Sequence, residues 1–223
     1  MILLSELKAL IYKEMLLEWR ERYALNGIVL YAVSAVFVCY LSFSVKTQSL
    51  SPVTWNTLFW IILLFTSVNA IAKSFMLERS ERQLYYYTLV SPQSIILSKI
   101  IYNTLLNFLI AGISLLVYMT LLGNPVQDFW LFLANILLGT IGFATTLTMV
   151  SGIAAKAENS STLMAILSFP IIIPMLLMLL KISQSALDGL ERNLSMDELI
   201  MLVAMNLIVF TLSLLLFPYL WRS

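Results

Sequence analysis

The stretch from Lys73 to Lys99, KSFMLERSERQLYYYTLVSPQSIILSK, is the longest charged interval between two very apolar segments. Acids and bases alternate at Glu78, Arg79, Glu81 and Arg82, a pattern suited to ion pairs and hydrogen bonds with another protein and unable to lie in hydrocarbon. Three consecutive tyrosines follow at 85–87, and tyrosine favours the membrane–water boundary. The segment therefore predicts a helix that lies at a membrane surface and is displaced by a partner protein.

The remaining sequence excludes most enzymatic chemistry. It has no histidine, its one cysteine is Cys39, and it contains no Gly-x-Ser-x-Gly or Gly-x-x-x-x-Gly-Lys motif. We therefore expect no catalytic site, no ATPase site, and no metal or cofactor bound by this chain itself. Proton-coupled transporters usually place an acid or base within a membrane span, and none stands there. Energy for any work must come from another chain.

Composition identifies the class of protein that must position the 73–99 segment. Hydrophobic residues make up 61% and charged residues 11% of the 223, far from the roughly 25% charged residues of soluble domains. Charge-free intervals long enough to cross a bilayer as helices occur at 23–45, 47–72, 100–127, 129–155, 159–180 and 199–221. A lipid-embedded backbone must satisfy its own hydrogen bonds. The sequence therefore predicts an all-α integral membrane protein with six transmembrane helices in a single domain, 1–223.

The predicted boundaries follow from these intervals. Residues 2–22 are expected to form an interfacial helix, with Ala9, Tyr12, Leu16, Trp19 and Tyr23 on one face, and Asn26-Gly27 to turn the chain into the first span. An ordinary helical cap on the first span is the alternative for this helix. The coupling segment is expected at 73–99, and the spans at about 26–45, 54–73, 100–122, 129–153, 162–181 and 199–219.

The basic residues predict the orientation. Ten of the 13 Lys and Arg residues fall in the two termini, the 73–99 segment and the short loop near Lys156. Lys46, Lys181 and Arg192 fall on the other side. Because cytoplasmic loops are richer in Lys and Arg, both termini and the coupling segment should be cytoplasmic. No basic cluster suggests nucleic acid.

Several features predict how the spans pack. Asn103 and Asn107 lie four apart and should hydrogen-bond neighbouring helices. The fourth span is rich in small residues, including Gly139, Thr140 and Gly142, which indicates close packing inside the bundle or, alternatively, a subunit interface. The fifth span contains Pro170 and Pro174, which should kink or break it, either as a static kink or as a moving hinge.

Two further expectations concern the opposite boundary. Trp55 and Trp60 are predicted to lie near the outer membrane boundary, where tryptophan is enriched. Ser195 followed by Glu198 matches a capping box at the start of the last helix.

The coupling segment resembles that of permeases of the second ABC exporter class. The resemblance rests on Phe75-x-x-Glu78, Leu89-x-Ser91-Pro92 and the closing Lys99. The Leu-Leu-Gly-Thr-x-Gly motif at 137–142 and the Pro-x-x-x-Pro motif at 170–174 are similar to the CcmB family, six-span permeases of the haem exporter of cytochrome c maturation. Residues 83 and 85–87 depart from the family pattern, which suggests a divergent branch.

This resemblance implies a permease in the bacterial inner membrane that works with other proteins. The implied partners are an ATP-binding cassette subunit that uses ATP, a haem-handling membrane protein, a periplasmic haem chaperone and a second copy of the permease. Haem would be the cargo. Two alternatives stay open: a permease of the same fold for a drug, lipid or polysaccharide, and a membrane scaffold without transport.

Overall fold

The computed structural model describes residues 2–20, 22–44, 50–71, 90–155 and 160–222. In these ranges the chain is helical, with no strand, and six helices are long and apolar enough to cross a membrane, which confirms the predicted fold class. The helices are α1 (Ile2–Arg20), α2 (Arg22–Ser44), α3 (Pro52–Ile71), α5 (Pro92–Leu122), α6 (Phe129–Ala154), α7 (Ser160–Asp188) and α8 (Met196–Arg222), with a short 3₁₀ helix, η1, at Arg192–Ser195.

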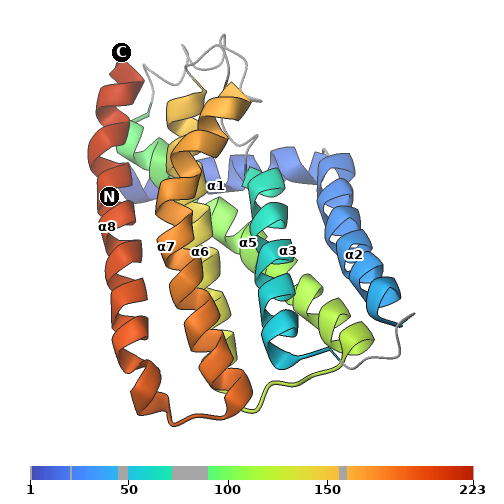
Figure 1. Cartoon of the computed structure of the whole chain (residues 1–223). Coiled ribbons are helices and arrows are strands. Elements are labelled where there is room, and N and C mark those ends of the chain that lie inside the picture. The colour runs from blue at the N-terminus through green and yellow to red at the C-terminus, as the bar shows by residue number, and fades with distance from the viewer. Residues whose placement is uncertain (1, 21, 45–49, 72–89, 156–159, 223) are drawn as a thin grey trace.

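The first helix lies across the others instead of alongside them. Figure 1 shows α1 crossing the bundle at the level where α2 begins and α3 ends. The turn expected at Asn26-Gly27 is wrong, because α2 continues through both residues from Arg22. An isolated Asn-Gly pair is a turn signal only where the helix is not stabilised by its context, and here a 23-residue apolar helix overrides it.

The core is organised around α6, which is buried along most of its length and packs against α3, α5, α7 and α8. Bulky aromatic rings fill the space beside it: Trp55, Phe59, Trp60, Tyr118, Phe132 and Phe143. Trp55 and Trp60 are both buried in this core, and their predicted place near the outer membrane boundary stays a prediction. Their indole N–H groups find partners inside, Trp55 at the Gly123 carbonyl and Trp60 at the Ser183 hydroxyl.

Helix α5 crosses the whole bundle as one 31-residue rod and starts at the Ser-Pro pair of the coupling segment. The Ser91 hydroxyl caps it by accepting a hydrogen bond from the Ser94 N–H, 3.3 Å away. Pro92 occupies the first turn, where its missing N–H needs no partner and its fixed φ suits the helix. Residues 92–99, expected to precede the third span, therefore form one continuous helix with it.

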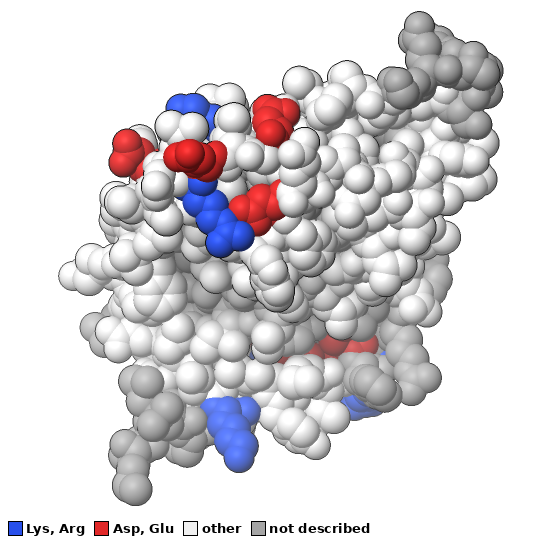
Figure 2. Space-filling model, turned by 90° about the horizontal axis from the view of Figure 1, so that it is seen from below, with Lys and Arg blue, Asp and Glu red and all other residues white. Residues whose placement is uncertain are grey.

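The opposite end of the bundle is fastened by polar contacts between two loops. Arg192 donates two hydrogen bonds to the Asp128 carboxylate, at 2.6 and 2.9 Å, and this pairing holds the pKa of the Asp128 carboxyl below its usual range. The backbone N–H groups of Gln127 and Asp128 both donate to the Ala186 carbonyl. Seen from below, a mixed group of acidic and basic side chains stands out at the upper left of a largely uncharged face, and a few more charged side chains lie along its lower edge (Figure 2).

The predicted capping box at this end is not formed. Ser195 is buried and its hydroxyl has no hydrogen-bond partner among the described residues, while Glu198 pairs with Lys181 of α7. The ion pair draws the Glu198 carboxylate to another helix, so the reciprocal bond to residue 195 is lost. The motif gave the right start for α8 but the wrong contacts.

Candidate functional site: a polar junction beside the coupling segment

A polar junction joins α1 to the first three turns of α5. We define it by Glu6, Glu14 and Glu18 on α1, Ser91, Ser94, Lys99, Tyr102 and Asn103 at or near the start of α5, and Thr148 on α6. At the end of the junction where α5 begins, the Glu6 carboxylate accepts hydrogen bonds from the Ser94 hydroxyl at 2.8 Å and the Ser91 hydroxyl at 3.2 Å. The cap of α5 is therefore bonded directly to α1.

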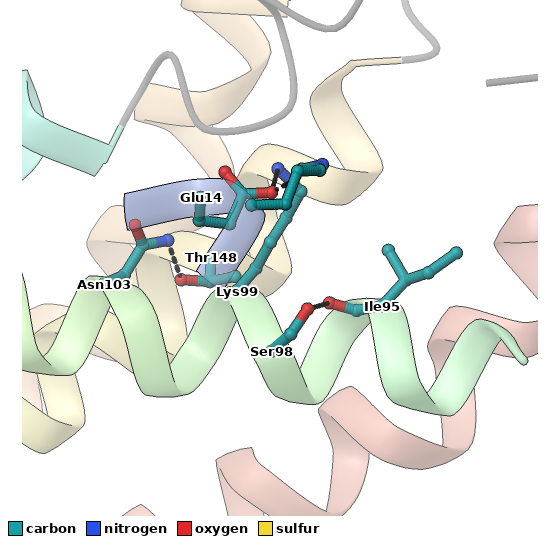
Figure 3. Close-up of polar contacts among 7 residues, drawn as sticks. Glu14, Ile95, Ser98, Lys99, Asn103 and Thr148 are labelled. Atoms are coloured by element: carbon teal, nitrogen blue, oxygen red, sulfur yellow. Dashed lines mark hydrogen bonds and ion pairs between the residues drawn. The ribbon is translucent and has the colours of Figure 1, made fainter. Parts of the chain in front are cut away.

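Its centre is the ion pair between Glu14 and Lys99. The Lys99 Nζ lies 3.4 Å from Glu14 Oε1, and the Lys99 side chain is only 2% exposed (Figure 3). Glu14 also pairs with its neighbour Lys13 at 2.9 Å. A buried ammonium is costly unless paired, so the position of α1 is tied to that of Lys99. One turn further on, the Tyr102 hydroxyl has Glu18 as its hydrogen-bond partner.

The inner end continues as hydrogen bonds between spans, as the Asn103 and Asn107 spacing predicts. The Asn103 amide donates to the Thr148 hydroxyl at 2.8 Å (Figure 3), and the Asn107 amide to the Thr140 carbonyl at 3.4 Å. Asn107 also accepts a hydrogen bond from Ser67 of α3 at 2.7 Å. The prediction that this pair bonds neighbouring helices is confirmed, and it links α5 to the central helix.

The predicted coupling residues divide into two groups. Phe75, Glu78, Arg79, Glu81 and Arg82 lie outside the described residues. Ser91, Pro92 and Lys99 lie in the junction, at or near the start of α5. Lys99 is buried against α1 and does not face solvent, so it cannot itself touch a partner in this conformation.

The small residues of α6 lie in the interior. A Cβ added at Gly139 would sit 2.8 Å from a ring carbon of Trp60, and one added at Gly142 would overlap Met175 Sδ and Asn206 Oδ1. Thr140 is buried and bonds the Leu137 carbonyl. Both glycines are therefore required where α6 approaches other spans closely.

This packing gives a prediction with an internal control. Gly139→Ala should lower the free energy of unfolding by about 1–3 kcal/mol, since the Trp60 ring is buried and fixed by its bond to Ser183. Gly112→Ala adds the same methyl group to α5 where nothing lies within 4 Å, so it should be neutral or stabilising by about 0.5–1 kcal/mol. Unfolding of both purified variants in one detergent measures the difference; equal behaviour would contradict the close approach.

The two prolines do not interrupt α7, which runs from Ser160 to Asp188 through both of them. Both prolines are exposed on the surface of the bundle, while the adjacent residue Met175 is buried and reaches Gly142. A break of the fifth span at this motif, one of the two outcomes expected, is therefore not observed.

The sequence analysis missed the α1 half of the junction. Glu6, Glu14 and Glu18 stand at positions separated by eight and four residues, which places them on one helix face with Leu10. That regular spacing was the available signal. The apolar residues Ala9, Tyr12 and Leu16 form a stripe on another face of the same helix and point to that face instead.

The junction consists of ion pairs and hydrogen bonds that join helices to one another. No cluster of three or more His, Cys, Asp or Glu that could hold a metal occurs in the part of the chain that the structure describes. Its polar side chains connect residues 91–103 to α1 and to the central helix α6.

Six apolar helices and this junction define a multi-pass membrane subunit whose polar groups connect helices. The chain belongs to the CcmB family: the family model described as CcmB protein matches residues 5–220. This is a family of haem-exporter permeases of cytochrome c maturation, which are subunits of an ABC transporter complex and not enzymes themselves. No curated protein and no solved structure matches the chain.

Proposed function

We propose that this chain is the permease subunit that couples ATP hydrolysis by a separate ATP-binding cassette protein to haem handling. The observation that supports it is the position of the polar junction. The segment between Ile71 and Val90 returns to the bundle at Ser91, whose hydroxyl is bonded to Glu6 and which caps the long helix α5. A displacement of that segment is therefore passed at once to α1 and α5.

The route of the displacement follows from the lengths and contacts of the helices. At a rise of about 1.5 Å per residue, α5 extends about 46 Å, the full depth of a bilayer. Its far end is linked to α3, because Gly123 accepts the Trp55 indole bond and the Tyr118 hydroxyl donates to the Trp55 carbonyl. Movement at the Ser91 cap would thus reach the opposite boundary. In this proposal, α7 also bends at a hinge formed by Pro170 and Pro174.

The proposal includes an orientation of the molecule in the membrane. The charged α1, the coupling segment and both termini face the cytoplasm, where the ATP-binding subunit docks on residues 73–82. The loops fastened by Asp128 and Arg192 then face the periplasm of a bacterial inner membrane. Haem-handling partners, a membrane protein and a periplasmic chaperone, would work from that side and within the bilayer. A second permease subunit completes the complex.

The cargo should be held by surface contact and not through its iron. Haem iron is held in proteins by His, Cys, Met or Tyr, and this chain has no histidine and a single cysteine, Cys39. The methionines are suited to filling irregular apolar gaps, as Met175 does beside Gly142.

Haem titration of the purified subunit should therefore show no six-coordinate, histidine-type absorption spectrum. The expected signal is the broad spectrum of haem in an apolar environment, unchanged in Cys39→Ser. A one-to-one complex with sharp ligand-field bands, lost on changing Cys39 or one methionine, would contradict this part of the proposal.

The partner claim is tested by co-expression with a candidate ATP-binding cassette protein from the same cells. The two should co-purify in detergent, and the complex should hydrolyse ATP. An unrelated ATP-binding cassette protein from the same cells is the control. If the candidate and the control ATP-binding cassette proteins are recovered equally, or if neither is recovered, the coupling proposal is contradicted and a membrane scaffold becomes the better account of this chain.

A further inference from the structure

The outward face of α1 carries no acidic residue among its described side chains. The acids face the bundle: Glu6 bonds α5, Glu14 pairs with Lys99, and Glu18 partners Tyr102. Leu10 is buried on that inward side, whereas three other large hydrophobic residues face away, with Tyr12 62%, Met15 54% and Leu16 45% exposed. This is the reverse of a soluble amphipathic helix, which buries its apolar side.

Two basic residues of α1 are exposed, whereas its acidic residues face the bundle. Lys8 and Arg20 are exposed, one on each side of the exposed apolar group along the helix. They are separated by 12 residues, about 18 Å in a helix, so each can reach a different lipid headgroup. Lys13, the remaining described base of α1, is partly buried and pairs with Glu14.

The level of α1 fits a membrane boundary. It crosses the bundle where α2 begins and α3 ends, both of them spanning helices (Figure 1). A helix at that level presents its apolar side chains to the acyl region and its cations to the headgroups. A face with cations and no acids is complementary to an anionic surface.

We propose that the outward face of α1, formed by Lys8, Tyr12, Met15, Leu16 and Arg20, binds anionic phospholipid headgroups at the boundary of one leaflet. The occupant is lipid and not a protein because α1 lies at the level where the spanning helix α2 begins, and most of the α2 span is not buried in the protein and therefore meets lipid. Since the inward face of the same helix holds the cap and the buried lysine of α5, the bound lipid also fixes the polar junction. This inference needs only the membrane fold and stands without the proposed function.

The test is lipid binding to the full-length protein, measured by native mass spectrometry with phosphatidylglycerol and phosphatidylcholine of equal chain length. Wild-type protein should bind phosphatidylglycerol preferentially. Each cation near an anionic surface contributes about fivefold in affinity, so K8Q/R20Q should lower the preference roughly 25-fold. K13Q removes one charge from the inward side of the same helix and should keep most of the preference.

Two outcomes would overturn the proposal. An unchanged preference in K8Q/R20Q would place anionic lipid elsewhere on the protein or leave the α1 face to a protein partner. A loss in K13Q as large as in K8Q/R20Q would mean that net charge, and not the outward face, sets the preference. A thermal unfolding curve for each variant, required to match wild type in phosphatidylcholine alone, separates lost binding from lost folding.

Discussion

Glu14→Ala should lower the stability of the purified protein by about 3 kcal/mol or more. The substitution removes a carboxylate 3.4 Å from an ammonium whose side chain is 2% exposed, and removal of one member of a buried ion pair is strongly destabilising. It also removes the central contact between α1 and the first turns of α5. Thermal or denaturant unfolding in one detergent, compared with wild type, measures the loss.

The reciprocal change should be milder, which gives the prediction its control. Lys99→Met keeps the length and apolar stem of the side chain, and Glu14 retains Lys13 at 2.9 Å. The double variant Glu14→Leu/Lys99→Met should unfold close to wild type, because well-packed apolar residues can replace a buried ion pair at little cost. Wild-type stability in Glu14→Ala alone would show that the pair does not hold α1.

Reversing Glu78 and Glu81 to Lys should abolish co-purification of the ATP-binding subunit or uncouple its ATP hydrolysis. Both carboxylates stand in the charged part of the coupling segment, on the side carrying ten of 13 basic residues. Loss of a charge pair at an interface costs about 2–5 kcal/mol, so recovery of the partner should fall roughly 30-fold or more. The measurement is the amount of ATP-binding subunit recovered, together with its ATPase rate.

The matched control makes the same charge change at the other end of the molecule. Glu191 lies in the loop after α7 and Asp197 in the first turn of α8; both are exposed, and their reversal to Lys should leave recovery of the ATP-binding subunit unchanged. If both double variants behave like wild type, residues 73–82 form a passive surface helix. If both lose the partner, the effect follows net charge and not the coupling segment.

The class of fold was predictable because its signals are local. A charge-free interval long enough to span a bilayer is visible in the sequence without knowledge of any neighbour, and Asn103 and Asn107 share a face through their spacing alone. Their partners, Thr148, Thr140 and Ser67, were not named, because helix order and rotation around α6 are tertiary properties.

The errors have the same physical origin. The buried contacts of Trp60 were not predicted, because its indole N–H donates to the Ser183 hydroxyl, 123 positions away in the sequence. The pairing of Glu14 with Lys99 joins residues 85 positions apart and has no local signature. Glu198 pairs with Lys181 of α7 instead of forming the expected capping box with Ser195.

The candidate site was thus only half predictable. The resemblance of the coupling segment singled out Ser91, Pro92 and Lys99 as residues in contact with a partner, whereas the structure places Lys99 in the interior of the junction. Its contacts give it a structural reason to be there: it ties α1 to α5. The charged residues at 78–82, which lie outside the described residues, keep their predicted role as the docking surface.

The central claim, that this permease serves haem delivery for cytochrome c maturation, is tested most directly by covalent haem attachment in cells. The measurement is haem-dependent peroxidase staining of c-type cytochromes after denaturing electrophoresis, in a strain lacking this gene. We expect the stained bands to disappear, to return with the wild-type gene, and to stay absent with the variant carrying Glu78→Lys and Glu81→Lys. Normal staining in the strain without the gene would contradict the claim.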